Sequence, residues 1–212
     1  MREFKIFDVT ATISSDLAVF PGDPSFRERL IHDDGFLLKE FCFCNHTGTH
    51  IDFPRHLFRE GKTSSDYSLQ TLCGEALVIE TESKSEILLS EIQSKDIRKN
   101  DIVFFKTRNS KISKNTYTEN FVSLSQEVTQ FCIDQKVKII GIDYLSVDAV
   151  KNADLPIHRL LLSHGIFIIE NLDLSEIKAG RYFANIYPLK VSNADGLPVR
   201  VSLQSAIAKE EN

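Results

Sequence analysis

The chain lacks a hydrophobic segment long enough to cross a membrane. Its longest apolar run, Leu160–Ile169, is interrupted by Ser163 and His164 and falls far short of the roughly 20 residues that a membrane-spanning helix needs. Residues 1–5 also lack the apolar core of a signal peptide. We therefore expect a soluble, cytoplasmic protein.

Clusters of positive charge are also missing. The 212 residues include 25 lysines and arginines against 30 aspartates and glutamates, and the basic residues are scattered along the chain. The net charge is -5. Nucleic acids and anionic membranes require a basic patch on their partner. The sequence therefore predicts that neither nucleic acid nor a membrane is a partner.

Cysteine is scarce, and no C-x-x-C motif occurs. The four cysteines are Cys42, Cys44, Cys73 and Cys132. Without a secretory signal, we do not expect disulfides. Cys42 and Cys44 alternate within a strand-like run and so share one face. We predict that both are small buried hydrophobic residues next to the histidine-rich segment that follows them; a metal or redox role is the alternative.

The composition is that of an ordinary globular protein, with 42% hydrophobic and 26% charged residues. No repeat or linker divides the chain, so we predict a single domain over residues 1–212. Strands are predicted where Ile, Val, Phe and Tyr concentrate, over Lys5–Ile13, Leu38–Asn45, Ala76–Glu80, Ile102–Thr107, Lys138–Asp143, Ile166–Glu170 and Tyr182–Val191. Helices are predicted over Ser85–Lys95, Ser123–Gln135 and Ile157–Ser163. Strands outnumber helices and alternate with them irregularly, so we expect an α+β or mixed α/β fold.

Histidines concentrate in one short segment, His46–His56, which reads His-Thr-Gly-Thr-His-Ile-Asp-Phe-Pro-Arg-His. A helix is disfavoured here, because glycine, two threonines and a proline interrupt it. A strand end with a turn at Gly48 fits better. His50 and Asp52, two residues apart, then point the same way, and the turn brings His46 beside them. Two imidazoles and one carboxylate form a three-ligand site with a position open to water, on zinc or manganese.

A single histidine near an apolar stretch is usually structural, but three histidines and one aspartate within this segment are not explained that way. His158 and Glu170 would be ordinary if taken alone, although Glu170 closes an isoleucine-rich predicted strand, a position from which a carboxylate can enter a site. We interpret His32 and His164 as structural or exposed residues.

The pattern His-x-Gly-Thr-His-x-Asp-x-Pro-x-His resembles the signature of the metal-dependent cyclase superfamily, which includes bacterial kynurenine formamidases and isatin hydrolases. The resemblance extends along nearly the whole chain. It includes the turn Phe20–Pro24, the segment Gly141–Asp148, and the pair formed by His158 and Glu170. Asn100 stands where the family usually has glycine. The resemblance implies a strand-rich, barrel-like mixed sheet flanked by a few helices.

The resemblance also implies roles for individual residues. His46, His50 and Asp52 would bind a first metal ion, zinc or alternatively manganese. Asp52 and Glu170 would bridge to a second ion, which His158 would also hold. His56 would act as general acid and base, since histidine titrates near neutral pH. A homodimer or homotetramer is the implied assembly.

The chain contains no tryptophan. In the formamidases, the residue before Pro-Gly-Asp is usually a tryptophan that stacks on the ring of the substrate, and here it is Phe20. A phenyl ring still offers a face for stacking. Phe20 is therefore the candidate substrate-binding residue, and an aromatic amide is the expected small-molecule substrate. Packing of the loop alone is the alternative role.

Three functions remain open from the sequence. The first is hydrolysis of an amide C–N bond, above all in an aryl formamide, by water activated at the metal. The second is ring-opening hydrolysis of a cyclic amide or lactone, as in isatin hydrolases. The third is a metal-binding protein without catalysis, which the presence of His56 and Glu170 disfavours, because a structural zinc needs no proton shuttle.

Overall fold

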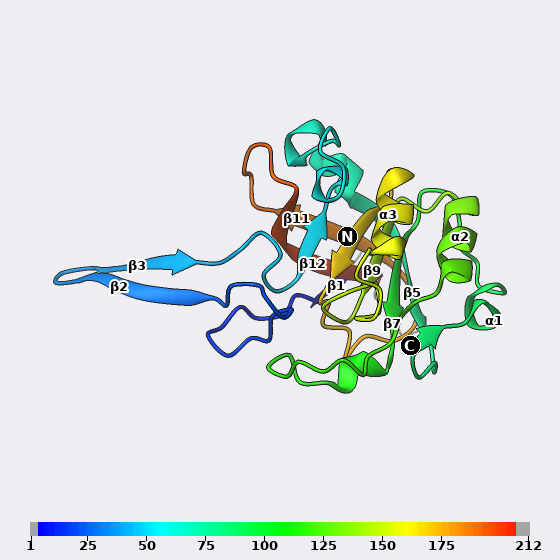
Figure 1. Ribbon diagram of the computed structural model, residues 1–212, viewed down its shortest axis with the longest axis horizontal. Coiled ribbons are helices and arrows are strands. Elements are labelled where there is room, and N and C mark those ends of the chain that lie inside the picture. Colours follow the sequence, from blue (N-terminus) through cyan, green and yellow to red (C-terminus); the bar gives the residue numbers. More distant parts are fainter. Residues whose placement is uncertain (1–3, 207–212) are drawn as a thin grey trace, which may run out of the picture.

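Seven strands close into a barrel. They are β4 (His50–Asp52), β5 (Cys73–Glu80), β7 (Ile102–Lys106), β9 (Ile139–Ile142), β10 (Phe167–Glu170), β11 (Gly180–Pro188) and β12 (Gly196–Ala206). The computed structural model describes residues 4–206 and orders these strands β12-β11-β5-β7-β9-β10-β4, with β4 pairing back onto β12. β1 (Phe4–Asp8) pairs with β12 outside this ring. Figure 1 shows the strands gathered at the centre of the molecule.

The sheet is mixed, and its parallel part is buried on both faces. β5, β7, β9 and β10 run parallel, whereas β4, β11 and β12 pair antiparallel with their neighbours. All seven strands contribute to one apolar cluster, which therefore fills the interior of the barrel. The alternate residues of β7 and β9, such as Val103 and Ile140, belong to a second cluster on the outside. Such two-sided burial is typical of parallel strands.

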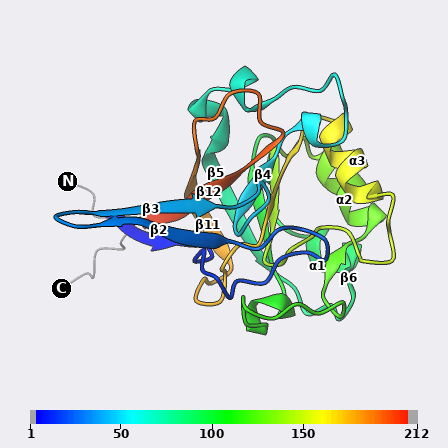
Figure 2. The same cartoon turned by 60° about the vertical axis from the view of Figure 1, so that its left-hand side comes forward.

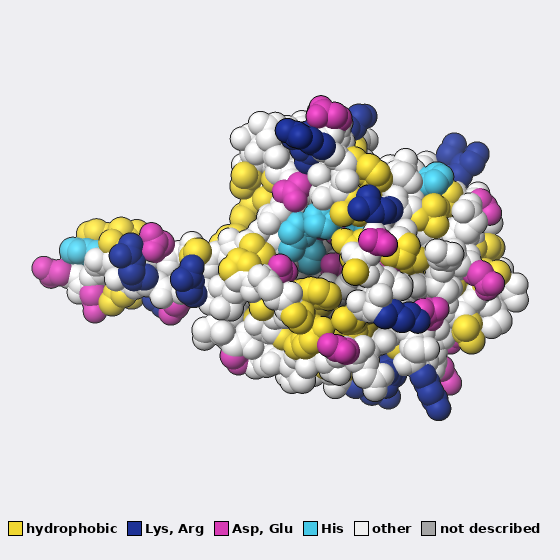
Figure 3. All heavy atoms as spheres, in the orientation of Figure 1, with side chains coloured by type: hydrophobic (Ala, Val, Ile, Leu, Met, Phe, Trp, Pro, Cys, Tyr) yellow, Lys and Arg dark blue, Asp and Glu magenta, His cyan; other side chains and the backbone are white. Residues whose placement is uncertain are grey.

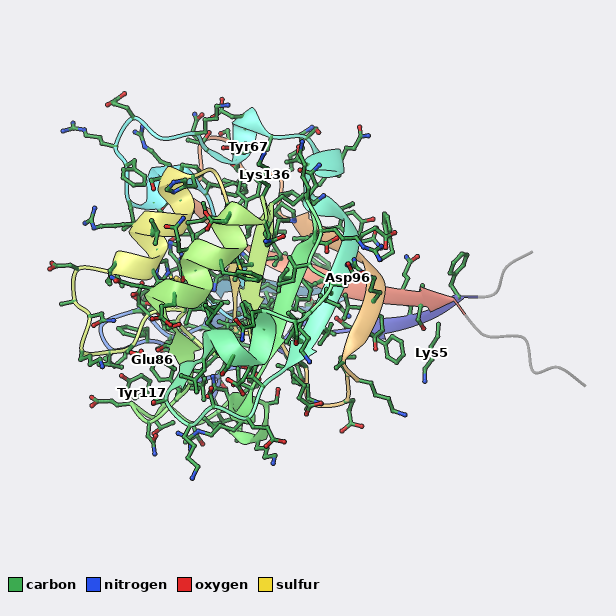
Figure 4. All side chains as sticks on the ribbon, turned by 90° about the vertical axis from the view of Figure 1, so that its right-hand side faces the viewer. Lys5, Tyr67, Glu86, Asp96, Tyr117 and Lys136 are labelled. Atoms are coloured by element: carbon green, nitrogen blue, oxygen red, sulfur yellow. The ribbon has the colours of Figure 1, made fainter. Side chains whose placement is uncertain are left out.

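Two helices cover the outer face of the parallel strands. α2 (Gln126–Asp134) and α3 (Pro156–Ser163) contribute buried residues to the outer cluster, and Figure 4 shows both in front of the sheet. The side chain of Ser125 accepts a hydrogen bond from Val128 N and so caps the start of α2. The other short elements are β6 (Glu86–Ile87), β8 (Ser123–Leu124), α1 (Leu89–Ile92), η1 (Pro54–His56), η2 (Ser64–Asp66), η3 (Leu69–Leu72) and η4 (Arg108–Lys111).

A two-stranded hairpin extends away from the barrel. β2 (Arg27–Asp33) and β3 (Leu37–Cys42) pair only with each other among the described residues, and Figures 1 and 2 show them projecting from the body. The prediction that Cys42 is buried is wrong, because it lies exposed on this hairpin. Cys44 is half-buried and its Sγ lies 3.3 Å from Thr47 Oγ1, beside the histidine-rich segment.

The predicted mixed fold with few helices is confirmed, but some boundaries differ. Each predicted strand overlaps an observed one, although β1 ends at Asp8 rather than Ile13 and β1, β3, β5 and β11 each begin before the predicted range. The helix predicted over Ser85–Lys95 is wrong, because only Leu89–Ile92 is helical. The Glu91 carboxylate accepts hydrogen bonds from the backbone of Ser83 and Leu88, and the residues before α1 form the short strand β6 instead of a helix.

Candidate metal centre

The short strand β4 positions the histidine-rich segment between two other strands. Its register places His50 opposite Glu170 on β10 and Asp52 opposite Gly196 on β12. Ile51 points into the barrel, so His50 and Asp52 point to the outer face. This confirms that the two side chains share one face.

The turn before β4 returns His46 to the same place. Gly48 has a φ of +68°, in the left-handed region that glycine adopts without strain. The carbonyl of Gly48 lies 2.9 Å from Nδ1 of His50, which leaves the Nε2 of that ring facing Glu170 at 3.3 Å. Nδ1 of His46 lies 2.9 Å from Oδ1 of Asp52. The predicted turn therefore brings both histidines to the aspartate.

His158 reaches the cluster from the first turn of α3. Asp148 accepts hydrogen bonds from the backbone N–H groups of Ile157 and His158 and so caps the helix. The same carboxylate lies 2.8 Å from Nδ1 of His158. The Nε2 of this ring is thereby directed at Glu170, at 3.1 Å, and at Asp52, at 3.6 Å. A carboxylate that fixes the outer nitrogen of a histidine is the usual support of a metal ligand.

The two carboxylates at the centre are almost fully buried, with side-chain exposures of 1% for Asp52 and 5% for Glu170. Burial alone would raise the pKa of Asp52, but contacts with His158 and His46 hold it well below its usual value. Burial also opposes ionisation of Glu170, yet the charge of His158 lowers the pKa of that carboxyl to about 2. Both carboxyl groups are therefore anionic at neutral pH, and nearby positive charge stabilises their ionised forms.

The pKa values of His46 and His56 are shifted in opposite directions. Burial would lower the pKa of His46, but the hydrogen bond and charge of Asp52 raise it to about 9. Burial lowers the pKa of His56, and together with repulsion by His46 and His158 it outweighs the attraction of Asp52 and Glu170. A neutral imidazole at His56 is the form that can accept a proton.

The donor set fits a divalent cation. Neither oxygen of Asp52 accepts a well-aligned hydrogen bond among the described residues, although imidazole nitrogens surround it. A buried carboxylate without hydrogen bonds is costly unless a cation satisfies it. Ligand atoms lie within 4.8 Å of one another in two groups, His46–Asp52–His56 and His50–Asp52–Glu170. Nitrogen and carboxylate donors of this kind suit zinc and manganese.

Asp52 belongs to both groups, and its role as a bridge between two ions stays a prediction. The division of the histidines differs from the predicted sets, however. His56, predicted as an acid and base, lies within ligand distance of His46 and Asp52. The structure thus brings all six predicted residues together without deciding which of them bind metal. Figure 3 shows one group of histidine side chains near the centre of the face in view. Among the histidines of the cluster, His46 and His56 have side-chain exposures of 18% and 22%.

Phe20 lies in a separate aromatic cluster. Its ring meets Tyr117 edge to face at a centroid distance of 6.1 Å, and Tyr144 belongs to the same cluster. Figure 4 labels Tyr117 at the edge of the molecule below the helices. The loop that carries Tyr144 also donates Val147 N–H to Glu170, which links this cluster to the carboxylates. His32 on the hairpin and the exposed His164 lie outside the metal cluster.

Two acidic residues of the site were not assigned roles from the sequence. Asp148 ends the segment Gly141–Asp148, and its role depends on a helix that begins eight residues later. Asp195 immediately precedes β12, and its Oδ2 lies 3.5 Å from Nε2 of His46 and 3.6 Å from Nδ1 of His56. The Asp-Gly pair at 195–196 would have been the only local signal for the second residue.

Comparison with known proteins agrees with this fold. Residues 7–149 match the Cyclase family, described as "Putative cyclase". The kynurenine formamidase of Salinibacter ruber is 30% identical over 207 residues, which cover 95% of this chain and 98% of the relative. A solved structure titled as a potential metal-dependent hydrolase with cyclase activity is 30% identical, covers 97% of this chain and 100% of its own, and has a TM-score of 0.87.

Isatin hydrolase A of Labrenzia aggregata shares the fold, with a TM-score of 0.85 over 96% of this chain and 94% of its own. At 22% identity, this likeness concerns the fold alone. The fold and the site together define the class of protein: a barrel that carries histidines and carboxylates on the outer face of its sheet. The chain belongs to the cyclase family.

No helix within residues 4–206 is both long and apolar enough to span a membrane.

Proposed function

We propose that this protein is a metal-dependent hydrolase that cleaves the C–N bond of an amide, most readily an aryl formamide. The observation that carries the proposal is the buried Asp52, to which no residue within 4–206 donates an aligned hydrogen bond and which the imidazoles of His46, His50 and His158 surround. The kynurenine formamidases among its relatives support the substrate class. Zinc, in one or two ions, is the proposed metal, with manganese as the alternative.

Different residues of the site have different roles in the proposed reaction. A divalent ion, when bound, supplies Lewis-acid activation of water and of the substrate carbonyl. Asp52 and Glu170 provide the negative charge that retains it, while Asp148 and the carbonyl of Gly48 hold His158 and His50 in orientation. His56 is the proposed base toward water and acid toward the leaving nitrogen, because its lowered pKa keeps it neutral near pH 7.

A panel of substrates on the zinc-loaded protein tests this function. It contains an aryl formamide, an aliphatic formamide, a cyclic imide and a lactone. Hydrolysis of each compound is measured by the release of its product. Turnover of the aryl formamide above the cyclic compounds supports the proposal. Preference for the cyclic compounds would assign ring-opening hydrolysis instead. Metal binding without turnover of any compound would favour a non-catalytic metal-binding protein.

The aromatic cluster makes a prediction about specificity. If Phe20 forms a wall against the ring of the substrate, Phe20→Ala should lower kcat/KM for the aryl formamide several-fold, since ring stacking contributes about 0.5–1.5 kcal/mol. Turnover of the aliphatic formamide should barely change. Phe20→Leu is the matched control, because it keeps an apolar packing group and removes the ring. Equal losses on both substrates, reversed by leucine, would show that Phe20 only packs against Tyr117.

A homo-oligomer is the proposed assembly, and the hairpin is its proposed contact. Phe36, Leu37 and Phe41 are 57–70% exposed there, and an isolated two-stranded hairpin is marginally stable in water. Leu37→Glu with Phe41→Glu should reduce the mass in light scattering to that of a 24.1 kDa monomer. Leu69→Glu, at a residue that is 54% exposed on η3, should leave the mass unchanged. An unchanged mass in the hairpin variant would exclude this contact.

A further inference from the structure

Asp195 stands at the outer rim of the metal cluster. Its backbone carbonyl accepts a hydrogen bond from Phe53 N at 2.8 Å, which ties it to the end of β4. Its Oδ1 accepts a hydrogen bond from Nδ2 of Asn45 at 2.9 Å. The other oxygen, Oδ2, is thereby turned toward two imidazoles, at 3.5 Å from Nε2 of His46 and 3.6 Å from Nδ1 of His56.

The two imidazoles differ in their need for this carboxylate. His46 already meets Asp52 through its Nδ1 at 2.9 Å. For His56, Asp195 is the one acidic group within 4 Å of a ring nitrogen among residues 4–206. No hydrogen bond of the His56 ring to another described residue competes with it; the backbone N–H of this residue bonds to Phe53 O. The orientation of the His56 ring therefore depends on Asp195 more than that of His46 does.

A proton-transferring histidine requires a fixed tautomer. If Nδ1 carries the hydrogen and faces a carboxylate, Nε2 is left as the basic nitrogen on the other side of the ring, as in catalytic triads. In His56 the nitrogen that faces Asp195 is Nδ1. The ring also lies 4.3 Å from His46 and 5.9 Å from His158, centroid to centroid, so it stands beside both of these rings of the cluster. Contacts of 3.6 Å at catalytic histidines commonly shorten when substrate binds.

We propose that Asp195 is a positioning residue that accepts a hydrogen bond from Nδ1–H of His56 and keeps Nε2 unprotonated toward the metal cluster. The inference rests on the proposed function, because it assigns His56 the role of acid and base. Asn45 holds Asp195 in place, and the carboxylate acts through His56 rather than on the substrate.

The neighbouring Gly196 provides a contrast. A Cβ atom at this position would lie 2.5 Å from Cε1 of His46, and its three nearest atoms all belong to that ring, so a side chain there displaces His46 first. Gly196→Ala is therefore expected to reduce metal content. Asp195→Ala, one residue away, is expected to leave metal content unchanged. The two adjacent substitutions thus distinguish two effects. Gly196→Ala disturbs the metal ligand His46, whereas Asp195→Ala disturbs the acid and base His56.

The test compares Asp195→Ala, Asp195→Asn and Asp195→Glu in the zinc-loaded full-length protein. Alanine and asparagine should each lower kcat by about 10–100-fold, the usual effect of removing an outer-shell partner, with KM within about threefold and zinc retained. Glutamate should restore part of the rate, because it keeps a carboxylate. In the His56→Ala background, Asp195→Ala should cause no further loss.

A second readout needs no substrate. In protein labelled with ¹⁵N-histidine and studied at pH 8, the His56 resonances, assigned by their absence in His56→Ala, should report the Nδ1–H tautomer. Asp195→Ala should convert them to a mixture of tautomers. An unchanged tautomer, loss of zinc, or an equal rate loss in the His56→Ala background would overturn the proposal. If no panel compound is turned over, the proposed function fails, while the resonances still decide the role of Asp195.

Discussion

Replacing Asp52 with alanine should remove bound metal and lower hydrolysis by about 10³-fold or more. This loss corresponds to about 4 kcal/mol, within the several kcal/mol that a metal ion contributes to such reactions. The effect is large because Asp52 belongs to both groups of ligand atoms. It is also the carboxylate that His46 and His158 both approach. Metal content by plasma mass spectrometry and turnover of an aryl formamide measure the two losses.

The control for this prediction must separate lost metal from lost folding. Asp52→Asn preserves the shape of the side chain and should still bind metal poorly, because its charge is gone. Asp134→Asn alters an exposed carboxylate at the end of α2 and should change neither quantity. Circular dichroism should be similar for all variants. Full metal content in Asp52→Ala would show that the cluster binds its ion without this residue, against the assignment.

The part of the site that the sequence predicts is the part built by local rules. The freedom of Gly48 to adopt positive φ and the two-residue period of a strand suffice to bring His46, His50 and Asp52 together. These relations involve residues only a few positions apart. The geometry of the segment could therefore be derived before the fold was known.

The rest of the site depends on contacts between distant segments. His158 and Glu170 looked ordinary in the sequence, and only the family resemblance marked them as ligands. In the structure, Glu170 faces His50 because β10 pairs with β4 in one particular register. The same closure of the barrel brings Asp195 to His56, 139 residues earlier in the chain. Patterns of hydrophobicity along one segment carry no information about such pairings.

The hairpin shows a different limit. The alternation in residues 38–45 predicts a strand, and β3 is a strand. The same pattern predicted that Cys42 is buried, yet the side chains of β3 are exposed. Periodicity indicates that a face is apolar, but it does not indicate whether the same chain covers that face. The proposed contact with a second copy would reconcile the pattern with the exposure.

His56→Ala should lower kcat by about 10²-fold or more while the protein stays folded and keeps its metal. This is the usual effect of removing a general acid or base. The ring lies beside the cluster, 22% exposed, at the end of η1 where Pro54 redirects the chain. Its pKa is lowered by burial, so the imidazole of His56 is neutral over most of the physiological pH range. The variant should therefore lose most of its rate at neutral pH.

Metal content decides between the two roles that the geometry allows for His56. Its ring nitrogen lies within ligand distance of His46 and Asp52, so a ligand role predicts that His56→Ala loses metal as well as rate. An acid and base role predicts that metal stays and that small amines such as imidazole partly restore the rate by filling the space of the missing ring. His164→Ala, at an exposed histidine outside the cluster, is the matched control and should match the parent protein in both. Near-normal turnover in His56→Ala would exclude both roles, since neither a lost ligand nor a lost proton carrier leaves the rate unchanged.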